Sequence, residues 1–153
     1  MRRPIAVLAV LALAAAALMG LTAIASSATS TPATVKTGTS SLGRIVVDGH
    51  AHTLYLFQKD KGGKSACSGA CAQNWPPLLT KGAPKAGTGA KAGLLGTTRR
   101  SDGTTQVTYN GHPLYTFVAD KGKPGSTNGQ GIEAFGARWY VVAATGTAKT
   151  GGY

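Results

Sequence analysis

One short pattern occurs twice in this chain of 153 residues, about sixty residues apart. The segment LYLFQKDKG begins at Leu54, and LYTFVADKG begins at Leu114. The segment VVDGH (46–50) precedes the first copy and resembles TYNGH (108–112), which precedes the second. The shared motif is Tyr-x-Phe-x-x-Asp, formed by Tyr55, Phe57, Asp60, Tyr115, Phe117 and Asp120. Internal repetition of this kind predicts two equivalent units that pack on each other.

Each unit is expected to be a β-hairpin. The segment 44–58 contains two apolar runs around a glycine-containing turn, and 105–119 contains the same pattern around Asn110-Gly111. Asn-Gly is the strongest short hairpin signal, because both residues tolerate a positive φ. Further strands are expected at 137–144 and, weakened by glycine, at 92–100. The chain is therefore predicted to be mainly β, a small single domain built from two hairpin-based repeats.

Alternation along the motif strands predicts which side chains share a face. Successive side chains of a strand point to opposite sides, so Tyr55 and Phe57 should lie on one face and Leu54 and Leu56 on the other. A two-stranded hairpin alone is marginal in water, so each unit needs a partner surface. The expected shared core contains Tyr55, Phe57, Tyr115, Phe117, Trp75 and Trp139. One short helical segment is expected near the cysteines, at 65–75, ended by two prolines.

The doubled motif resembles that of a bacterial secreted-repeat family, often labelled predicted lipoprotein with a Yx(F/W/Y)xxD motif. The resemblance rests on both motif copies, on Cys-x-x-x-Cys and Trp-Pro-Pro after the first copy, and on Gly-Gln-Gly after the second. It covers about 43–143 and implies an exported domain that is extracellular or associated with the cell envelope. It implies no activity. The chain departs from the lipoprotein label, because no cysteine near the expected cleavage site could accept a lipid.

The ends of the chain predict export and a tether. Arg2 and Arg3 precede an apolar run and an Ala-x-Ala pattern ending at Ala25, which is typical of a secretory signal peptide over 1–25. The Ser/Thr/Ala-rich segment 26–40 is expected to be a flexible tether. A two-repeat β domain should follow over 41–145, with repeat one at about 43–80 and repeat two at about 103–143, and 146–153 is expected to be a tail.

The charge balance points to anionic partners. Lysine and arginine together number 16, against five acidic residues. Such an excess attracts anionic cell-wall polymers, acidic membrane surfaces or nucleic acid. The basic residues are scattered in glycine-rich loops, and no nucleic-acid-binding module is recognisable, so nucleic acid is not expected as a partner. A merely solvated basic surface is the alternative.

Cys67 and Cys71 are the only cysteines, and an even count in an exported chain favours a disulfide between them. Four residues apart on one helical turn, their Cα atoms would lie about 6 Å apart, within reach of a bridge. A redox-active dithiol is one alternative. Another is a soft-metal site or electron-transfer centre that uses the two thiolates with His50, His52 or His112.

The histidines and acids have structural and chemical interpretations. His50 and His112 follow the turn glycine of each unit and are expected to flank the turns, although His50 and His52 together could form a surface metal site. Asp60 and Asp120 each end a strand, where aspartate commonly accepts hydrogen bonds from turn amides. Pairing of the two carboxylates as an acid–base dyad is the chemical alternative.

These observations favour a secreted, non-catalytic module of the envelope or extracellular space that binds an anionic polymer, a small ligand or a protein. A metal-binding or electron-transfer accessory protein is the alternative, and an enzyme is the third. No catalytic residue, metal ligand or cofactor is predicted.

Overall fold

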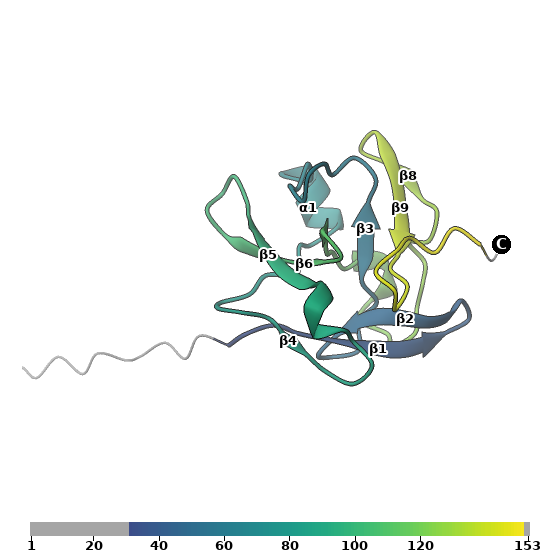
Figure 1. Cartoon of the computed structure of the whole chain (residues 1–153). Coiled ribbons are helices and arrows are strands. Elements are labelled where there is room, and N and C mark those ends of the chain that lie inside the picture. The colour runs from purple at the N-terminus through teal and green to yellow at the C-terminus, as the bar shows by residue number, and fades with distance from the viewer. Residues whose placement is uncertain (1–30, 152–153) are drawn as a thin grey trace, which may run out of the picture.

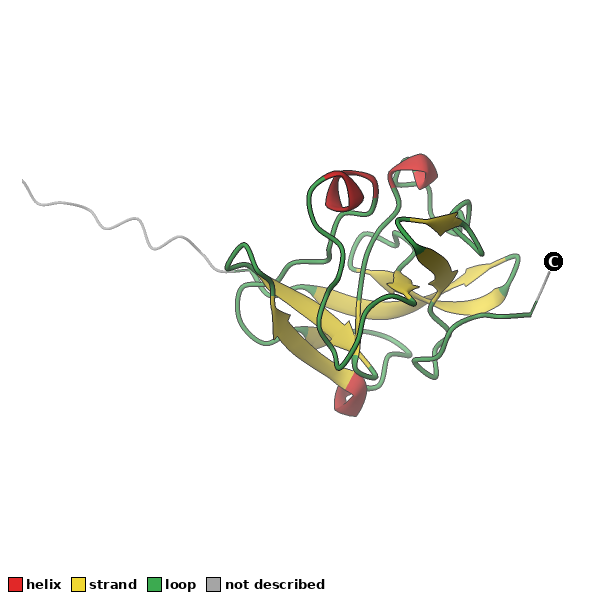
Figure 2. Cartoon of the chain, turned by 90° about the horizontal axis from the view of Figure 1, so that it is seen from above, coloured by secondary structure: helices red, strands yellow, loops and turns green. Residues whose placement is uncertain are grey.

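A computed structural model describes residues 31–151. The predicted signal peptide (1–25), the first part of the predicted tether (26–30) and the last two residues lie outside the described residues. The elements in chain order are β1 (Thr34–Ser40), β2 (Gly43–Asp48), β3 (Tyr55–Phe57), α1 (Ala70–Asn74), β4 (Lys85–Ala86), η1 (Ala92–Leu94), β5 (Leu95–Arg99), β6 (Thr105–Tyr109), β7 (His112–Pro113), η2 (Val118–Asp120), β8 (Glu133–Ala134) and β9 (Ala137–Val141). The fold is mainly β, as predicted, and the helical turns lie at the periphery of the strands (Figure 2).

The strands form three small sheets with the orders β2-β1-β4, β3-β9-β8 and β5-β6-β7. Figure 1 shows β3 and β9 side by side, with the β1–β2 ladder below them in this view. Isolated bridges join the sheets, among them Ile45 with Ala143, Leu79 with Gln106, and Tyr55 with Tyr115. The last of these connects the two motif copies directly.

The predicted alternation divides the buried side chains into two clusters. Tyr55 and Phe57 lie in one cluster, together with Tyr115 and both tryptophans. Leu54 and Leu56 lie in the other, with Leu114, Val107 and Tyr109 among their neighbours. The motif strands are thus buried on both faces, and each face contributes to a different part of the core.

The second unit contains the predicted hairpin. Strands β6 and β7 pair antiparallel, with Tyr109 opposite His112. The turn residues Asn110 and Gly111 have φ values of 50° and 77°, both positive. This is the pair of positive φ angles that a tight two-residue hairpin turn requires. The 92–100 segment also forms its predicted strand, β5, which pairs with β6.

The first unit differs from the simple hairpin expected over 44–58. Strand β2 finds its main partner in β1, and β3 pairs with β9. Only the bridge between Val47 and Thr53 and neighbouring backbone bonds hold the expected hairpin together. In the first unit β1 therefore takes the place of β5 and β2 that of β6, and the single bridge at Thr53 takes the place of the β6–β7 ladder.

The tether and tail expectations are wrong for most of their described residues. Thr34–Ser40 form β1, because Val35 is fully buried and the β-branched Thr37 and Thr39 suit a strand. The segment after 145 folds back onto the domain through a bridge between Val142 and Ala148. Sequence composition hid both segments because Ser, Thr, Ala and Gly dominate them.

The observed helix α1 is shorter than the predicted helical segment 65–75. Gly69 has a φ of 56°, outside the helical region, so α1 begins only at Ala70. The helix ends at Asn74, with Trp75 as its C-cap, before the two prolines. Cys67 therefore precedes the helix and Cys71 lies within it. Among the described residues, no helix has the length and apolar character needed to cross a membrane.

Gly129 allows the Gly-Gln-Gly segment to approach the core. A Cβ atom at this position would lie 2.7 Å from Trp75 and 2.8 Å from Tyr55. Gln130 then accepts a hydrogen bond from the Val141 amide at 2.9 Å, which fixes the segment to β9. The segment therefore packs closely against the aromatic rings of the core.

Gly129→Ala should lower the free energy of unfolding by about 1–3 kcal/mol, the usual cost of overpacking a filled core. Gly93→Ala is the matched control, because a Cβ at Gly93 would meet nothing within 4 Å. Urea denaturation of both variants measures the difference. Equal midpoints for the two variants would contradict the close packing at Gly129.

Candidate functional site at the paired repeat motif

The two motif copies meet at their tyrosines. The Tyr55 amide donates a hydrogen bond to the Tyr115 carbonyl at 2.8 Å, and the Tyr115 amide donates to the Tyr55 carbonyl at 3.0 Å. Because the same backbone groups exchange hydrogen bonds in both directions, the two copies are related by a local twofold symmetry at this point. The units therefore pack through the motif itself.

The tyrosine and aspartate of each motif interact with the other copy. The Tyr55 hydroxyl donates to Asp120 Oδ2 at 2.6 Å. The Tyr115 hydroxyl donates to Asp60 Oδ2 at 2.8 Å. These are short hydrogen bonds to a charged acceptor, which are stronger than bonds between neutral groups. Each motif is therefore completed by the other repeat.

The second oxygen of each aspartate accepts turn amides, as the sequence predicted. Asp60 Oδ1 accepts from the Ala66 amide at 2.8 Å. Asp120 Oδ1 accepts from the Asn128 amide at 2.9 Å and from the Ser126 hydroxyl at 3.1 Å. Both carboxylates are directed at these donors and at tyrosines. The geometry favours a structural role over that of an acid–base dyad. We call the four residues Tyr55, Asp60, Tyr115 and Asp120 the motif clamp, because each aspartate joins a loop of its own copy to the tyrosine of the other copy.

Burial sets the protonation of the clamp. It raises the pKa of both Tyr55 and Tyr115, and the partner aspartates raise it further. The phenols are therefore protonated donors across the physiological range. Burial also raises the pKa of Asp60. The hydrogen bonds from the Ala66 amide and the Tyr115 hydroxyl lower this pKa and so offset part of the increase. Because the pKa of each phenol is raised, neither tyrosine is suited to act as a base.

The aromatic side chains of the motifs form a continuous column. Phe57 stacks on Trp139, Trp139 on Trp75, and Trp75 on Phe117, each pair with ring centroids 4.0 Å apart. The two tryptophans form the middle, and the two motif phenylalanines form the ends. Tyr55 meets Trp75 edge-on at 5.3 Å, and Tyr115 meets Trp139 edge-on at 5.1 Å. All six aromatic residues expected in a shared core thus belong to one assembly.

A buried arginine supports one side of this assembly. Arg100 is 8% exposed and donates to the Cys67 carbonyl at 2.7 Å and to Gln106 Oε1 at 2.7 Å. It also donates to Ser65, whose hydroxyl contacts that of Tyr115 at 2.7 Å. Its Nε lies 3.8 Å from Asp102 Oδ2. Sequence reasoning missed this network, because nothing distinguishes Arg100 from its exposed neighbour Arg99 in the sequence.

The two cysteines lie at disulfide distance, with their sulfur atoms 2.00 Å apart and their Cα atoms 5.2 Å apart. Both are buried in the cluster that contains Trp75. Sulfur atoms joined in this way are not thiolate ligands. Among residues 31–151, no group of three or more histidines, cysteines or acids is placed to hold a metal ion.

The histidines are arranged differently from the prediction. The backbone pairing places His52 opposite Asp48 and His112 opposite Tyr109, so His52 is the structural counterpart of His112. His50 lies on the exposed turn, because the first unit has one more turn residue than the second. The His52 ring contacts Asp48 Oδ2 through Nδ1 at 3.0 Å. The equivalence of His50 and His112 drawn from the glycine alone is wrong.

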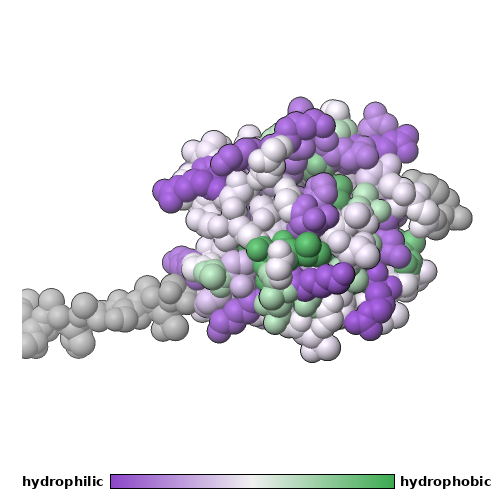
Figure 3. Space-filling model, viewed as in Figure 1, coloured by the Kyte–Doolittle hydropathy of each residue, from purple (hydrophilic) through white to green (hydrophobic). Residues whose placement is uncertain are grey.

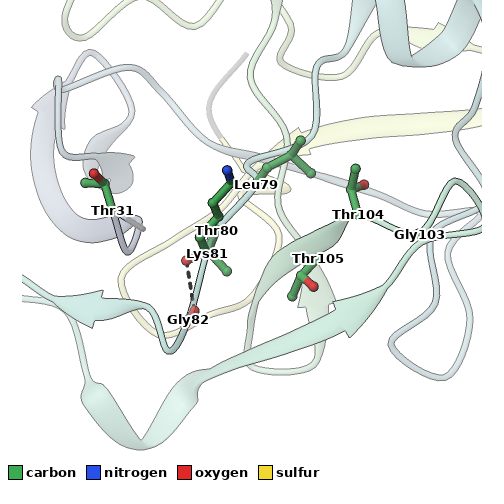
Figure 4. A pocket seen from close by; sticks show the side chains of 8 residues that line it. All are labelled: Thr31, Leu79, Thr80, Lys81, Gly82, Gly103, Thr104 and Thr105. Carbon is green, nitrogen blue, oxygen red and sulfur yellow. Dashed lines mark hydrogen bonds between the residues drawn. The ribbon is translucent and has the colours of Figure 1, made fainter. Parts of the chain in front are cut away.

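One hollow of the surface lies away from the motif. It is a groove of about 680 Å³ between the segment after Leu79 and the start of β6 (Figure 4). Threonine side chains and Lys81 dominate its lining. The Thr80 hydroxyl is already engaged, because it accepts from the Ala33 amide and donates to the Gly82 carbonyl, both at 3.0 Å. Elsewhere the visible face carries hydrophilic side chains around small apolar patches (Figure 3).

Comparison with protein families matches the chain twice to one family model, described as a secreted repeat of unknown function. The matched segments are residues 36–79 and 96–143. They begin in β1 and β5, the equivalent first strands of the two units, and so extend each predicted repeat toward the N-terminus. No curated protein and no solved structure matches the chain.

A double-mutant cycle should detect the exchange of tyrosine and aspartate between copies. Tyr55→Phe should cost about 1.5–3 kcal/mol of unfolding free energy and Asp120→Asn on the order of 1 kcal/mol. The two should couple by about 1 kcal/mol. The control is Tyr55→Phe with Asp60→Asn, which belong to the same copy and should be additive. Chemical denaturation measures both cycles, and coupling in the same-copy pair alone would overturn the exchange.

Stability should depend on pH through His112. Burial lowers the pKa of its imidazole, so between that value and about 6.5 the unfolded chain binds more protons than the folded chain. Stability should therefore fall as the pH falls through about 6.5, and His112→Gln should weaken this dependence. His50→Gln, on the exposed turn, is the control. Urea midpoints across the acid range provide the measurement, and identical profiles for the two variants would contradict it.

Proposed function

The chain belongs to the family of secreted repeats of unknown function, and on this premise we propose that it is a non-catalytic extracellular module that binds an anionic polymer of the cell envelope. The single observation that supports the proposal is the distribution of its acids. Three of the five are engaged within the fold, and the other two lie beside arginines. The lysines thus have almost no acidic neighbours on the surface.

The three engaged acids accept hydrogen bonds from turn and loop amides. Asp60 and Asp120 hold the motif clamp. Asp48 accepts from the amides of His50 and His52 at 2.9 and 2.8 Å and closes the first turn. Asp102 and Glu133 are exposed, but they face Arg100 and Arg138 at 3.8 and 3.6 Å. None of the salt bridges in the described part of the chain contains a lysine.

The lysines outside the salt bridges lie in loops of both repeats and in the segment between the repeats, which contains β4. Residues 31–151 contain fourteen of the sixteen basic residues, against all five acids. Eight lysines are exposed: Lys59, Lys61, Lys64, Lys81, Lys85, Lys91, Lys121 and Lys123. Charges spread over several loops suit an extended flexible polyanion better than a compact ligand, because the polymer can contact many of them at once. The absence of a helical basic stripe is consistent with a partner other than duplex nucleic acid.

Binding of the secreted protein to linear polyphosphate and to poly-glutamate, measured by calorimetry, tests this proposal. Both polyanions should bind, and affinity should fall steeply as salt rises above about 0.1 M because exposed charges are screened. Neutral dextran of similar length is the control and should not bind. Equal binding to dextran, or no binding to either polyanion at low salt, would overturn the proposal.

A further inference from the structure

The duplication builds one kind of cleft twice. The His52 cleft, of about 180 Å³, is lined by His52, Thr53, Thr116, Phe117, Val118, Asp120, Gly122 and Lys123. The His112 cleft, of about 470 Å³, is lined by Leu56, Phe57, Gln58, Asp60, Lys61, His112, Thr147 and Ala148. The histidine, phenylalanine and aspartate that line one cleft each lie sixty residues along the chain from their counterparts in the other cleft. A lysine completes each lining.

Each cleft needs both repeats. The His52 cleft takes its histidine from repeat one and its phenylalanine, aspartate and lysine from repeat two. In the His112 cleft the contributions are exchanged. His52 Nε2 lies directly against Gly122, where an added Cβ would be 3.1 Å away. On the other side, an added Cβ at Gly63 would lie 3.5 Å from the Gly111 carbonyl, next to His112.

Phe57 and Phe117 connect the clefts through the core. They are the two end rings of the aromatic column, and each lines one cleft. The column between them consists of the two buried tryptophans. The two clefts therefore lie at opposite ends of one stack of buried aromatic rings.

In the His52 cleft, the two nearby carboxylates are already engaged, Asp120 by the clamp and Asp48 by the His52 ring. Asp120 directs its carboxylate at Tyr55, Ser126 and Asn128. Asp48 lies behind the His52 ring at Nδ1, which leaves Nε2 on the side of Gly122. The ring therefore lies between the Asp48 carboxylate and the side of Gly122. Lys123 adds a charge that lies in no salt bridge of the described residues.

We propose that the two clefts are paired subsites, each taking one phosphate or carboxylate group of the polyanion. This inference rests on the proposed function and adds a place to it: two anionic groups of one polymer are held by histidines at equivalent positions and by one lysine in the lining of each cleft. Binding of both groups by one chain is cooperative through effective concentration, so loss of either subsite weakens the whole complex.

The three histidines allow a test within one molecule. In NMR spectra of the imidazole groups, linear polyphosphate should shift the signals of His52 and His112 at the same polymer concentration. His50, exposed on the turn and outside both cleft linings, is the internal control and should shift less. Poly-glutamate in a second titration distinguishes phosphate from carboxylate: the subsites prefer whichever polymer shifts the pair at lower concentration. Shifts that His50 shares equally would overturn the inference.

Charge-neutral variants provide the second measurement. Lys61→Gln and Lys123→Gln should each weaken polyphosphate binding about fivefold, and the double variant should lose more than either, because a charged contact is lost in each cleft. Lys85→Gln, an exposed lysine outside both clefts, is the matched control and should lose less than twofold. If the polymer binds but the three single variants behave alike, the subsites are wrong and the proposed function stands. If neither polyanion binds the parent protein, both are wrong.

Discussion

The exchange of tyrosine and aspartate between the two repeats is the interaction on which the rest of the structure depends. A buried carboxylate is costly unless donors surround it, and a buried phenol needs an acceptor. Neither repeat supplies both within itself, because Tyr55 reaches Asp120 and Tyr115 reaches Asp60. A single repeat would leave the phenol and one oxygen of the carboxylate without their partners. It would also contain none of the three ring stacks, because each stack joins a residue of one repeat to a residue of the other. The duplication is therefore a requirement of the polar interior as well as of the apolar core.

The local features of this arrangement were readable from the sequence. Alternation at 54–57 separated the two clusters correctly, and Asn110-Gly111 predicted its turn. The two cysteines, four residues apart in an exported chain, predicted the disulfide. Each of these depends on residues close together in the chain. The doubled motif also predicted that the copies would pack, because hairpins of this size cannot remain alone.

What the sequence did not reveal depends on contacts between distant residues. In the sequence, each tyrosine lies close to the aspartate of its own copy. Its hydrogen-bond partner is nevertheless the aspartate of the other copy, so this pairing is visible only in the structure. Strand β1 was mistaken for a tether because its threonines and serines have the composition of a linker, and only its pairing with β2 makes it a strand. Alignment on the turn glycine paired His50 with His112, whereas the backbone pairing, with its one extra turn residue in the first unit, makes His52 the counterpart of His112.

The way the fold uses its acids also determines the character of its surface. A chain with only five acidic residues that engages three of them in turns and clamps leaves its lysines almost without opposite charges nearby. The motif residues that define the repeat are mostly buried, so they set the positions of the loops without forming the outer surface. The loops that follow Asp60 and Asp120 carry four of the exposed lysines, and the clamp fixes where both loops begin. A motif that serves stability thereby positions the charged groups through which the protein meets its surroundings.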